Sequence, residues 1–335
     1  MTDNADLHWR PIQVGDVAQW AVLAAAAEQA DGELDHTSEQ ELSELLAAPD
    51  CDFADGSIAA YDGDVMVAAA FVLPRSSADP VHDMRLGGMV HPGYRRRGIG
   101  GQVLDWAEQG AITVHDKMHP GRPLALHGWS VSGHTGAAAL FEAHDYRAVR
   151  WWRKMRMDLS AVPPAAAEPD GVQILSFSQG ICEQGINEQQ MIEDARLVRN
   201  EAFQDHWGST ESTAQAWAHS LGQHGFRPGF SYLAYAGGHA VGVLLGFEHE
   251  ANTKATGSRD LYIGIVGTRR AGRNRGIASA LMSRALADGK ADGFATSSLL
   301  VDGDSLTGAV GLYERIGFGT EQTNITWAKD LIAAG

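Results

Sequence analysis

The stretch Arg95-Arg96-Arg97-Gly98-Ile99-Gly100 returns 178 positions later as Arg273-Asn274-Arg275-Gly276-Ile277-Ala278. Both copies fit the pattern R-x-x-G-x-[G/A]. An extended apolar stretch precedes each copy and a helical apolar pattern follows it, so each predicts a strand, a basic glycine turn and the start of a helix. Such a turn leaves backbone N–H groups unpaired at the positive end of the helix dipole. It either holds a pyrophosphate or is an ordinary surface turn between a strand and a helix.

The residues downstream of the two copies are also alike, and they favour the first alternative. The second copy leads to Ala309-Val310-Gly311-Leu312-Tyr313-Glu314-Arg315-Ile316-Gly317-Phe318, and the first leads to Ala138-Ala139-Leu140-Phe141-Glu142-Ala143-His144-Asp145-Tyr146. A basic R-x-x-G-x-[G/A] turn that is followed by A-x-x-L-Y-E-x-x-G-F resembles the GNAT N-acetyltransferases. Two copies that together cover nearly the whole chain resemble a tandem GNAT protein.

The length and the repeat together predict two domains. A chain of 335 residues is long enough to bury two separate cores. The proline- and alanine-rich stretch 161–171 lacks apolar periodicity and lies between the two signatures, so it predicts a linker. We therefore expect an N-terminal domain over 1–160, a linker over 161–171 and a C-terminal domain over 172–335.

Each half shows the same order of elements, which predicts an α+β fold around a mixed sheet. A strand, a helical region and a hairpin come first, followed by the strand, turn and helix of the signature, a further strand, a helix and a final strand that closes the unit. The first helices are expected at 17–30 and 188–203. The strands are expected at 7–12, 57–62, 65–73, 86–90, 124–129 and 149–159, and at 172–177, 231–236, 240–248, 261–266, 296–301 and 323–329.

The resemblance implies acetyl-CoA as the co-substrate and no metal ion. In the GNAT family the backbone N–H groups of the glycine turn hold the pyrophosphate, and the pantetheine arm lies along the preceding strand. In the second copy the matching positions are Val266, Gly267 and Thr268 on the strand and Arg273, Asn274, Arg275, Gly276, Ile277, Ala278 and Ser279 in the turn. In the first copy they are Gly88, Met89 and Val90 on the strand and Arg95, Arg96, Arg97, Gly98, Ile99, Gly100 and Gly101 in the turn.

Tyr313 matches the family tyrosine that faces the coenzyme sulfur, where a phenol can protonate the departing thiolate. For a single helix tyrosine without that resemblance, a packing role would be the simpler interpretation. The first copy has Phe141 at this position and Asp145 in place of Gly317. Because phenylalanine has no proton to donate, we expect the first domain to bind CoA without turnover and the second domain to catalyse.

The attacking amine also needs a proton acceptor, and the second copy offers two carboxylates. Many family members carry a glutamate 11 positions ahead of the first residue of the turn, where this chain has Tyr262. Asp260 lies two residues earlier and so on the same strand face. Glu248 ends the neighbouring strand. Each carboxylate is either the general base or a solvated charge at a strand end.

The residues after the first helix of the second half are expected to shape the acceptor pocket, as they do in the family. Phe203, His206 and Trp207 offer aromatic walls and an imidazole that can accept a proton, and packing roles are the alternative. The tandem arrangement with the complete tyrosine motif in the second copy is similar to that of the mycothiol synthases. Those proteins continue from the matching histidine with P-E-Q-G, whereas His206 is followed here by Trp207-Gly208-Ser209-Thr210.

Composition and charge exclude several other classes of protein. A formal net charge of −16 argues against a nucleic-acid partner. The longest clean apolar run, 65–73, is too short to cross a bilayer, and the N-terminus is acidic rather than a signal sequence. We therefore expect a cytoplasmic monomer or homodimer with no membrane partner. His115 and His119 have an i, i+4 spacing typical of metal ligands, but no third ligand is nearby and we expect both to face solvent.

The resemblance predicts an N-acetyltransferase that moves an acetyl group from acetyl-CoA to the primary amine of a small molecule. Two alternatives stay open: a non-catalytic acyl-CoA-binding or sensor protein, for which Phe141 sets a precedent within this chain, and a mycothiol-synthase-like acetylation of an amino-sugar thiol precursor. A hydrolase or dehydrogenase is disfavoured. The sequence has no G-x-S-x-G elbow and no Walker sequence, and Gly98-x-Gly100 lacks the third glycine of a dinucleotide turn.

Overall fold

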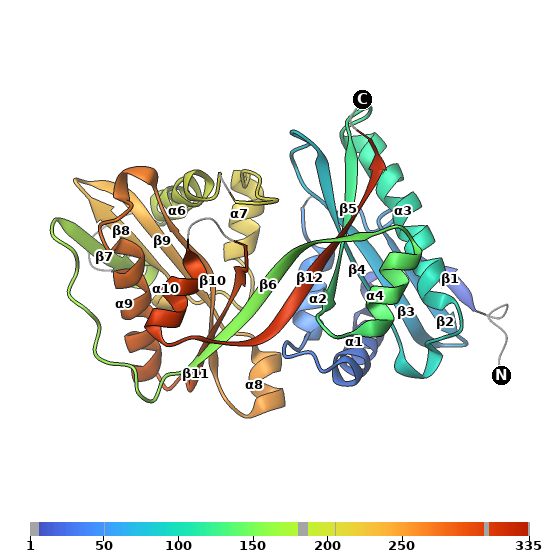
Figure 1. The fold of residues 1–335 in the computed structure, drawn as a ribbon, viewed down its shortest axis with the longest axis horizontal. Coiled ribbons are helices and arrows are strands. Elements are labelled where there is room, and N and C mark those ends of the chain that lie inside the picture. Colours follow the sequence, from blue (N-terminus) through green and yellow to red (C-terminus); the bar gives the residue numbers. More distant parts are fainter. Residues whose placement is uncertain (1–6, 50, 180–186, 205, 305–307, 334–335) are drawn as a thin grey trace. The chain divides into compact units, whose positions relative to one another are not determined.

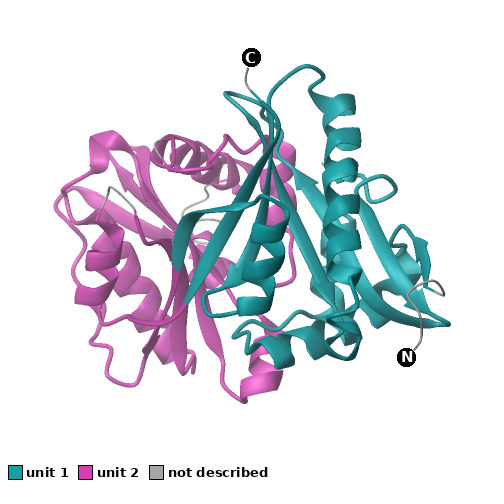
Figure 2. Ribbon diagram, turned by 45° about the vertical axis from the view of Figure 1, so that its right-hand side comes forward, with its two compact units in different colours: residues 1–152, 323–335 teal, residues 153–322 magenta. Residues whose placement is uncertain are grey.

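The computed structural model describes residues 7–49, 51–179, 187–204, 206–304 and 308–333. The chain divides into two compact units: unit 1 consists of residues 1–152 and 323–335, and unit 2 of residues 153–322. Figure 2 colours the two units separately, and Figure 1 labels their helices and strands. We describe each unit by itself.

Unit 1 is a mixed sheet with helices on both faces. The strands β1 to β4 are antiparallel neighbours, and β4 pairs with β5 in parallel. The parallel pair is joined by a helix, as a parallel connection requires. In chain order the elements are β1 (His8–Arg10), α1 (Val17–Asp31), α2 (Glu39–Leu46), β2 (Ser57–Asp62), β3 (Val65–Pro74), β4 (His82–Val90), α3 (Ile99–Met118), β5 (Leu124–Val131), α4 (Thr135–Ala143) and the first part of β6 (Arg147–Asp158).

Unit 2 repeats this arrangement. The strands β7 to β10 are antiparallel neighbours, and β10 pairs with β11 in parallel. The mixed α/β sheet expected from the sequence is therefore confirmed. In chain order the elements are β7 (Val172–Ser176), α6 (Glu188–Ala202), α7 (Ala214–Leu221), β8 (Tyr232–Ala236), β9 (His239–Phe247), α8 (Glu250–Thr256), β10 (Asp260–Thr268), α9 (Ile277–Ala291), β11 (Thr296–Asp302), α10 (Ala309–Ile316) and the first part of β12 (Gly319–Ile332).

Each sheet is buried on both faces because its two faces pack against different helices. Successive strand residues point to opposite sides, and on β3 Ala68 and Ala70 belong to the core under α3, whereas Ala69 belongs to the core under α1 and Phe71 packs against it. In unit 2 the residues of β9 divide in the same way between a core under α9 and a core under α6. Fully buried strands read as continuous apolar runs, which is why β3 and β9 carry so few polar residues.

We expected the final strand of each half to close its own unit. The structure instead divides both final strands, β6 and β12, between the two units. Residues 323–332 of β12 lie in unit 1, where they pair with β5 in antiparallel register from Asn324 opposite Val131 to Lys329 opposite Leu126. Residues 153–158 of β6 lie in unit 2. Unit 1 therefore takes residues 323–332 from the far end of the chain to complete its sheet, whereas unit 2 takes the second part of β6, which directly precedes its other elements in the chain.

The core residues explain this division of the two strands. Trp327 is 4% exposed in the core of unit 1, and its indole Nε1 donates a hydrogen bond to Ser130 Oγ at 2.9 Å. Met155 is fully buried in the core of unit 2. The stretch expected to be a linker also lies in unit 2, where Val162 joins the same core and its carbonyl accepts a hydrogen bond from Lys290 Nζ at 2.8 Å.

Candidate active site

A wedge between two parallel strands positions the candidate site in each unit. In unit 2, β10 pairs with β11 only from Asp260 to Ile263, although both strands continue beyond this point. On its other edge β10 stays paired with β9 as far as Thr268. The backbone groups of the last residues of β10 therefore have a free edge toward the wedge. An extended ligand with amide groups can pair with such an edge as an additional strand would.

Unit 1 has the same wedge. Its strand β4 pairs with β5 only from His82 to Arg85, although β4 runs to Val90. The residues that we expected along the pantetheine arm, namely Gly88 to Val90 here and Val266 to Thr268 in unit 2, all lie beyond the last parallel pair. The two copies of the signature thus place the same strand ends beside the same kind of opening.

The glycine turn has one backbone conformation in both copies. Its second residue is left-handed, with φ +63° at Arg96 and +61° at Asn274, and so is its glycine, with φ +83° at Gly98 and +75° at Gly276. Glycine adopts such angles without steric cost. In a turn that contains left-handed residues, successive backbone N–H groups can point into one concavity, which favours an anion.

The two helices that follow these turns also lack a side-chain N-cap. Gly98 precedes α3 and Gly276 precedes α9, and neither has a side chain that could accept a hydrogen bond from the helix start. By contrast, Ser38 caps α2 and Asn187 caps α6 through their side chains. The first N–H groups of α3 and α9 are thus left for another acceptor, which a pyrophosphate oxygen could supply.

The first arginine of the turn differs between the copies. The Arg95 guanidinium makes a bidentate ion pair with Asp31, at 2.5 and 2.9 Å, and its Nε donates to the carbonyl of Val90 at 3.0 Å. The same carboxylate lies 3.0 Å from Nε2 of His134 at the start of α4. Among the described residues, the Arg273 side chain has no hydrogen bond or ion pair. The first copy therefore ties its arginine to the end of α1, and the second leaves it available to a ligand.

The wedge of unit 1 opens into a cavity of about 570 Å³, within the usual range for small-molecule sites. Its lining combines the end of β4, the glycine turn, the first turns of α3, the end of β5 and one side of α4. The sequence alone did not bring Asp31 or His134 to this site, because both are far from the turn in the chain and meet it only in the fold.

The aromatic residues that follow the two turns have different surroundings. Phe141 is buried in the core of unit 1, where its ring stacks on Trp327 with centroids 5.6 Å apart and planes 15° apart. Tyr313 lies half-buried on α10, with its ring centroid 6.0 Å from that of Phe318. Burial of the Tyr313 phenol raises its pKa to about 12, so the hydroxyl stays protonated at neutral pH and remains a hydrogen-bond donor.

The two carboxylates considered as general bases are both buried and both paired. The Glu248 oxygens accept hydrogen bonds from Arg259 Nε at 2.7 Å and from Arg227 Nε at 3.0 Å. The Arg259 guanidinium, followed by that of Arg227, lowers the pKa of Glu248 despite its burial. A carboxylate with a lowered pKa is a weaker proton acceptor, which argues against Glu248 as the base.

Asp260 is held in the same way. One carboxylate oxygen accepts a hydrogen bond from Thr296 Oγ1 at 2.6 Å and lies 3.3 Å from Arg156 Nη1, and the other oxygen accepts from the Ser298 hydroxyl. Both residues were expected to be either bases or solvated strand-end charges. Their contacts give them a third role, which is to fix β10 against its neighbouring strands.

The three residues expected in the acceptor pocket follow α6, beside the free end of β10. The ring of Phe203 packs on Gly267, where an added Cβ would lie 3.0 Å from it. The Phe203 and His206 rings are 4.6 Å apart between centroids, and Trp207 is half-buried next to them in the chain. The aromatic surface thus lies against the strand that carries the expected pantetheine positions.

The expectation for His115 was wrong. His115 is fully buried, and its Nδ1 lies 2.8 Å from Nδ1 of His82 on β4. The His119 ring packs edge-on against His82, with centroids 4.7 Å apart. No local pattern signals this pairing, because His82 and His115 are 33 positions apart and belong to a strand and a helix. Within the described ranges, no group of three or more His, Cys, Asp or Glu side chains could hold a metal ion.

The structure also bears on membranes. No helix in the described part of the chain has both the length and the apolar composition needed to cross a bilayer.

Comparisons with known proteins identify the family of this chain. The family model described as "Acetyltransferase (GNAT) family" matches residues 192–318. A relative from Thermobispora bispora is 30% identical over 324 residues, which cover 95% of this chain and 96% of the relative. The chain therefore belongs to the GNAT family of N-acetyltransferases. Enzymes of this family use an acyl-CoA donor and an acceptor substrate.

The names of individual relatives are more specific than the family description. The Thermobispora bispora protein is named mycothiol acetyltransferase, as is a relative from Catenulispora acidiphila that is 28% identical over 322 residues and covers 93% of this chain and 95% of its own. A solved GCN5-related N-acetyltransferase from Sphaerobacter thermophilus has a TM-score of 0.72 and 27% identity, covering 100% of this chain and 98% of its own. A tandem GNAT protein from the clavulanic acid biosynthesis pathway has a TM-score of 0.71 at 17% identity, covering 98% of this chain and all of its own, and shares the fold.

Proposed function

We propose that this chain transfers the acetyl group of acetyl-CoA to the primary amine of a small molecule, and that catalysis takes place in unit 2. The observation that carries the proposal is the difference between Tyr313 and Phe141 at matching positions of two otherwise similar wedges. The first is a protonated phenol on α10, and the second is a core aromatic without a proton to donate.

The proposed reaction needs one anchored donor and two proton movements. The amine nitrogen attacks the thioester carbonyl carbon and forms the C–N bond, the C–S bond breaks, the nitrogen releases a proton to solvent water, and the thiolate gains a proton from Tyr313. We assign the pyrophosphate to Arg273, Asn274, Arg275, Gly276, Ile277, Ala278 and Ser279, and the pantetheine amides to the free edge of β10. Tyr313 then donates a hydrogen bond, and finally a proton, to the departing sulfur.

The amine is proposed to enter in its neutral form. Glu248 and Asp260 both accept hydrogen bonds from arginine, serine or threonine side chains, and Arg259 and Arg227 lower the pKa of Glu248, so we assign the amine proton to neither carboxylate. In that case kcat/KM rises with pH along the titration of the free amine. The opposite result would be a bell-shaped pH profile of kcat/KM whose acid limb is the same for amines of different pKa. If that limb disappears in Glu248→Gln or in Asp260→Asn, the substituted carboxylate is the general base.

The acceptor is the part of the proposal that rests on relatives. Because the relatives are named mycothiol acetyltransferases, an amino-sugar thiol precursor is the second candidate acceptor. Two departures count against it: Trp207-Gly208-Ser209-Thr210 follows His206, and Tyr262 replaces the strand glutamate. Phe203, His206 and Trp207 are proposed to form the acceptor wall.

The test is thiol release from acetyl-CoA across a panel of small amines that includes the amino-sugar thiol precursor of mycothiol. We expect Tyr313→Phe to lower kcat by about a hundredfold or more for the best amine. Tyr94→Phe is the matched control, because it removes a tyrosine hydroxyl from unit 1 and should leave kcat unchanged. Full turnover in Tyr313→Phe would refute the assignment of the acid. Absence of turnover with every amine, together with CoA binding, would favour a sensor.

Unit 1 is proposed to bind CoA without turnover through Gly88, Met89, Val90 and the turn from Arg95 to Gly101. The full chain must be used, because residues 323–332 complete this unit. Calorimetry should show two CoA sites. Gly136 lines the cavity, and a Cβ added there would meet no atom within 4 Å, so Gly136→Leu adds side-chain volume to the lining from an unobstructed Cβ. This variant should retain one site and full kcat; a single site in the wild-type protein would contradict the proposal.

A further inference from the structure

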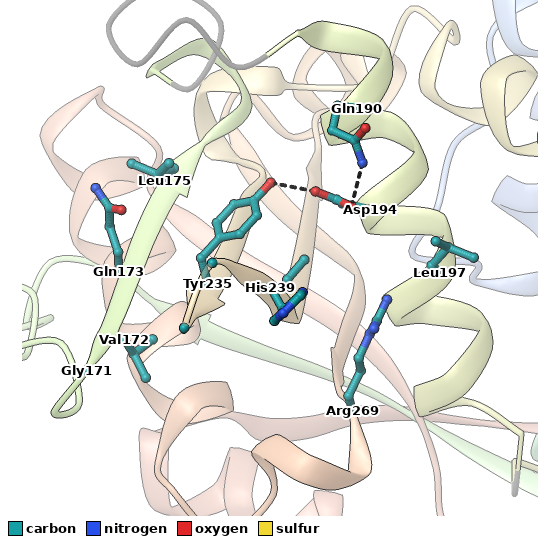
Figure 3. Close-up of a pocket in the computed structure, with 13 residues that line it drawn as sticks. Gly171, Val172, Gln173, Leu175, Gln190, Asp194, Leu197, Tyr235, His239 and Arg269 are labelled. Carbon is teal, nitrogen blue, oxygen red and sulfur yellow. Dashed lines mark hydrogen bonds between the residues drawn. The ribbon is translucent and has the colours of Figure 1, made fainter.

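A second cavity lies in unit 2, between α6, the edge strand β7 and the β8–β9 hairpin (Figure 3). Its volume is about 880 Å³, which is again in the range of small-molecule sites. None of the residues assigned above to the coenzyme, to the acceptor or to proton transfer lines it. The proposed acetyl transfer therefore leaves this cavity without a role.

One wall of the cavity carries a fixed negative charge. Asp194 of α6 accepts hydrogen bonds from the Tyr235 hydroxyl and from Gln190 Nε2, each at 3.0 Å. Figure 3 shows both side chains pointing toward this carboxylate. Burial, together with the nearby Asp194 charge, raises the pKa of Tyr235, so the phenol stays a donor and holds the carboxylate in place. A carboxylate oxygen can accept a further hydrogen bond from a ligand.

A cationic side chain faces the same space. The backbone N–H of Arg269 donates to the carbonyl of Val241 at 2.9 Å, which fixes this residue at the end of β10. Its guanidinium is only loosely paired, because Glu201 Oε2 lies 3.7 Å from Nε, and that buried Nε has no hydrogen-bond partner among the described residues. In Figure 3 the side chain extends toward the region between Asp194, His239 and Leu197.

The remaining lining is apolar or open. Val172, Leu175 and Leu197 contribute aliphatic surface, and Leu197 is 41% exposed although it is a large apolar residue. A Cβ added at either glycine of the hairpin, Gly237 or Gly238, would meet no atom within 4 Å, so the backbone leaves room on that side. The cavity thus combines one fixed anion, one under-satisfied cation and an aliphatic surface.

We propose that this cavity binds a small zwitterion of the amino-acid class, with its carboxylate on Arg269 and His239 and its ammonium group on Asp194. A ligand with one charge of each sign satisfies both walls, and an aliphatic side chain covers the exposed Leu197. A polyanion such as a nucleotide fits poorly, because Asp194 would face its negative charge across the cavity.

The proposal is tested by calorimetric titration of the full-length protein with L-alanine, L-leucine and L-glutamate. Acetate and methylammonium, which each carry one of the two charges, and inorganic phosphate serve as comparison ligands. We expect at least one amino acid to bind, and both single-charge ligands to bind at least tenfold more weakly. Because heat is measured rather than acetylation, the result does not depend on the proposed reaction.

Paired variants identify the cavity as the place of binding. Arg269→Gln and Asp194→Asn should each weaken the amino acid about tenfold or more, since each leaves one ligand charge unpaired. Lys254→Gln and Glu188→Gln are the matched controls, because both remove one exposed charge of unit 2 outside the cavity and should change the affinity less than twofold. Circular dichroism verifies that all four variants are folded.

Three outcomes would overturn the proposal. The first is the absence of saturable heat with every amino acid of the panel at millimolar concentration, which would show that the cavity does not bind amino acids. Acetate or phosphate binding as tightly as the amino acids would make the cavity an anion site instead. Binding that survives both Arg269→Gln and Asp194→Asn would place the ligand elsewhere on the chain.

Discussion

Replacement of Trp327 by alanine should destabilise unit 1 although this residue lies close to the C-terminus. The indole is buried between β5 and α4, stacks on Phe141 and donates a hydrogen bond to Ser130 Oγ. Truncation of a buried tryptophan to alanine costs about 3–5 kcal/mol of unfolding free energy, because transfer and cavity costs add. At the lower bound this changes the opening equilibrium of the unit by roughly a hundredfold.

Hydrogen exchange read by mass spectrometry is the assay, since it reports local opening separately for each segment. Amides of α3 and β5 should lose about a hundredfold of their protection in Trp327→Ala, whereas amides of α9 and β9 should change little. Trp327→Phe keeps an aromatic ring for the stack but leaves the Ser130 hydroxyl without its donor, so we expect a smaller loss of about 1–2 kcal/mol. Trp151→Ala is the matched control, because Trp151 is 42% exposed.

The reasoning would be refuted if protection in α3 and β5 stayed at the wild-type level, or if α9 and β9 lost as much protection as unit 1. The first result would mean that the C-terminal segment does not complete unit 1. The second would mean that the substitution acts on the whole chain rather than on the core to which Trp327 belongs.

Two further predictions concern buried groups. Burial lowers the pKa of His82 to about 4 and lowers the pKa of His115 as well. As the pH falls below about 6.5, the ordinary pKa of histidine, the unfolded chain therefore binds more protons than the folded chain. His82 alone should lower the free energy of unfolding by about 2 kcal/mol between pH 6.5 and 5. Urea unfolding of His82→Gln should show a clearly flatter pH dependence across that window, and an unchanged slope would contradict the assignment. A Cβ on Gly267 would lie 2.9 Å from the Cβ of Ala202, so Gly267→Ala should lower the melting temperature and reduce the free energy of unfolding by about 1–3 kcal/mol. Gly319→Ala is the control, because a Cβ there meets no atom within 4 Å and should leave the melting temperature unchanged. Equal melting temperatures for Gly267→Ala and the wild-type protein would show that the strand can shift.

Much of each unit could be predicted because its signals are local. Apolar runs bounded by turns marked β2 and β3, and the structure ends β2 at the expected residue and extends β3 by one residue. The glycines of the two signatures correctly indicated turns, because the left-handed φ at Gly98 and Gly276 is a local backbone conformation that glycine adopts without steric cost. Comparison of Phe141 with Tyr313 likewise needed only aligned motifs, and it led directly to the choice of unit 2 as the proposed catalytic unit.

The errors and omissions all involve partners that are distant in sequence. The sequence left Glu248 as either a general base or a solvated strand-end charge, and only the fold brings Arg227 and Arg259 to its oxygens. His115 has the spacing of a surface pair, yet its partner His82 comes from a different element. The ion pair between Arg95 and Asp31 likewise joins residues 64 positions apart.

The sequence by itself determined the repeated unit, its element order and the basic glycine turns, because periodicity and backbone conformation are properties of neighbouring residues. The tertiary structure alone decided which charges are neutralised, where the parallel strands separate, and that residues 323–332 complete the sheet of unit 1. These depend on contacts such as Trp327 with Ser130, 197 positions apart, whose stability comes from burial in a common core rather than from any local preference.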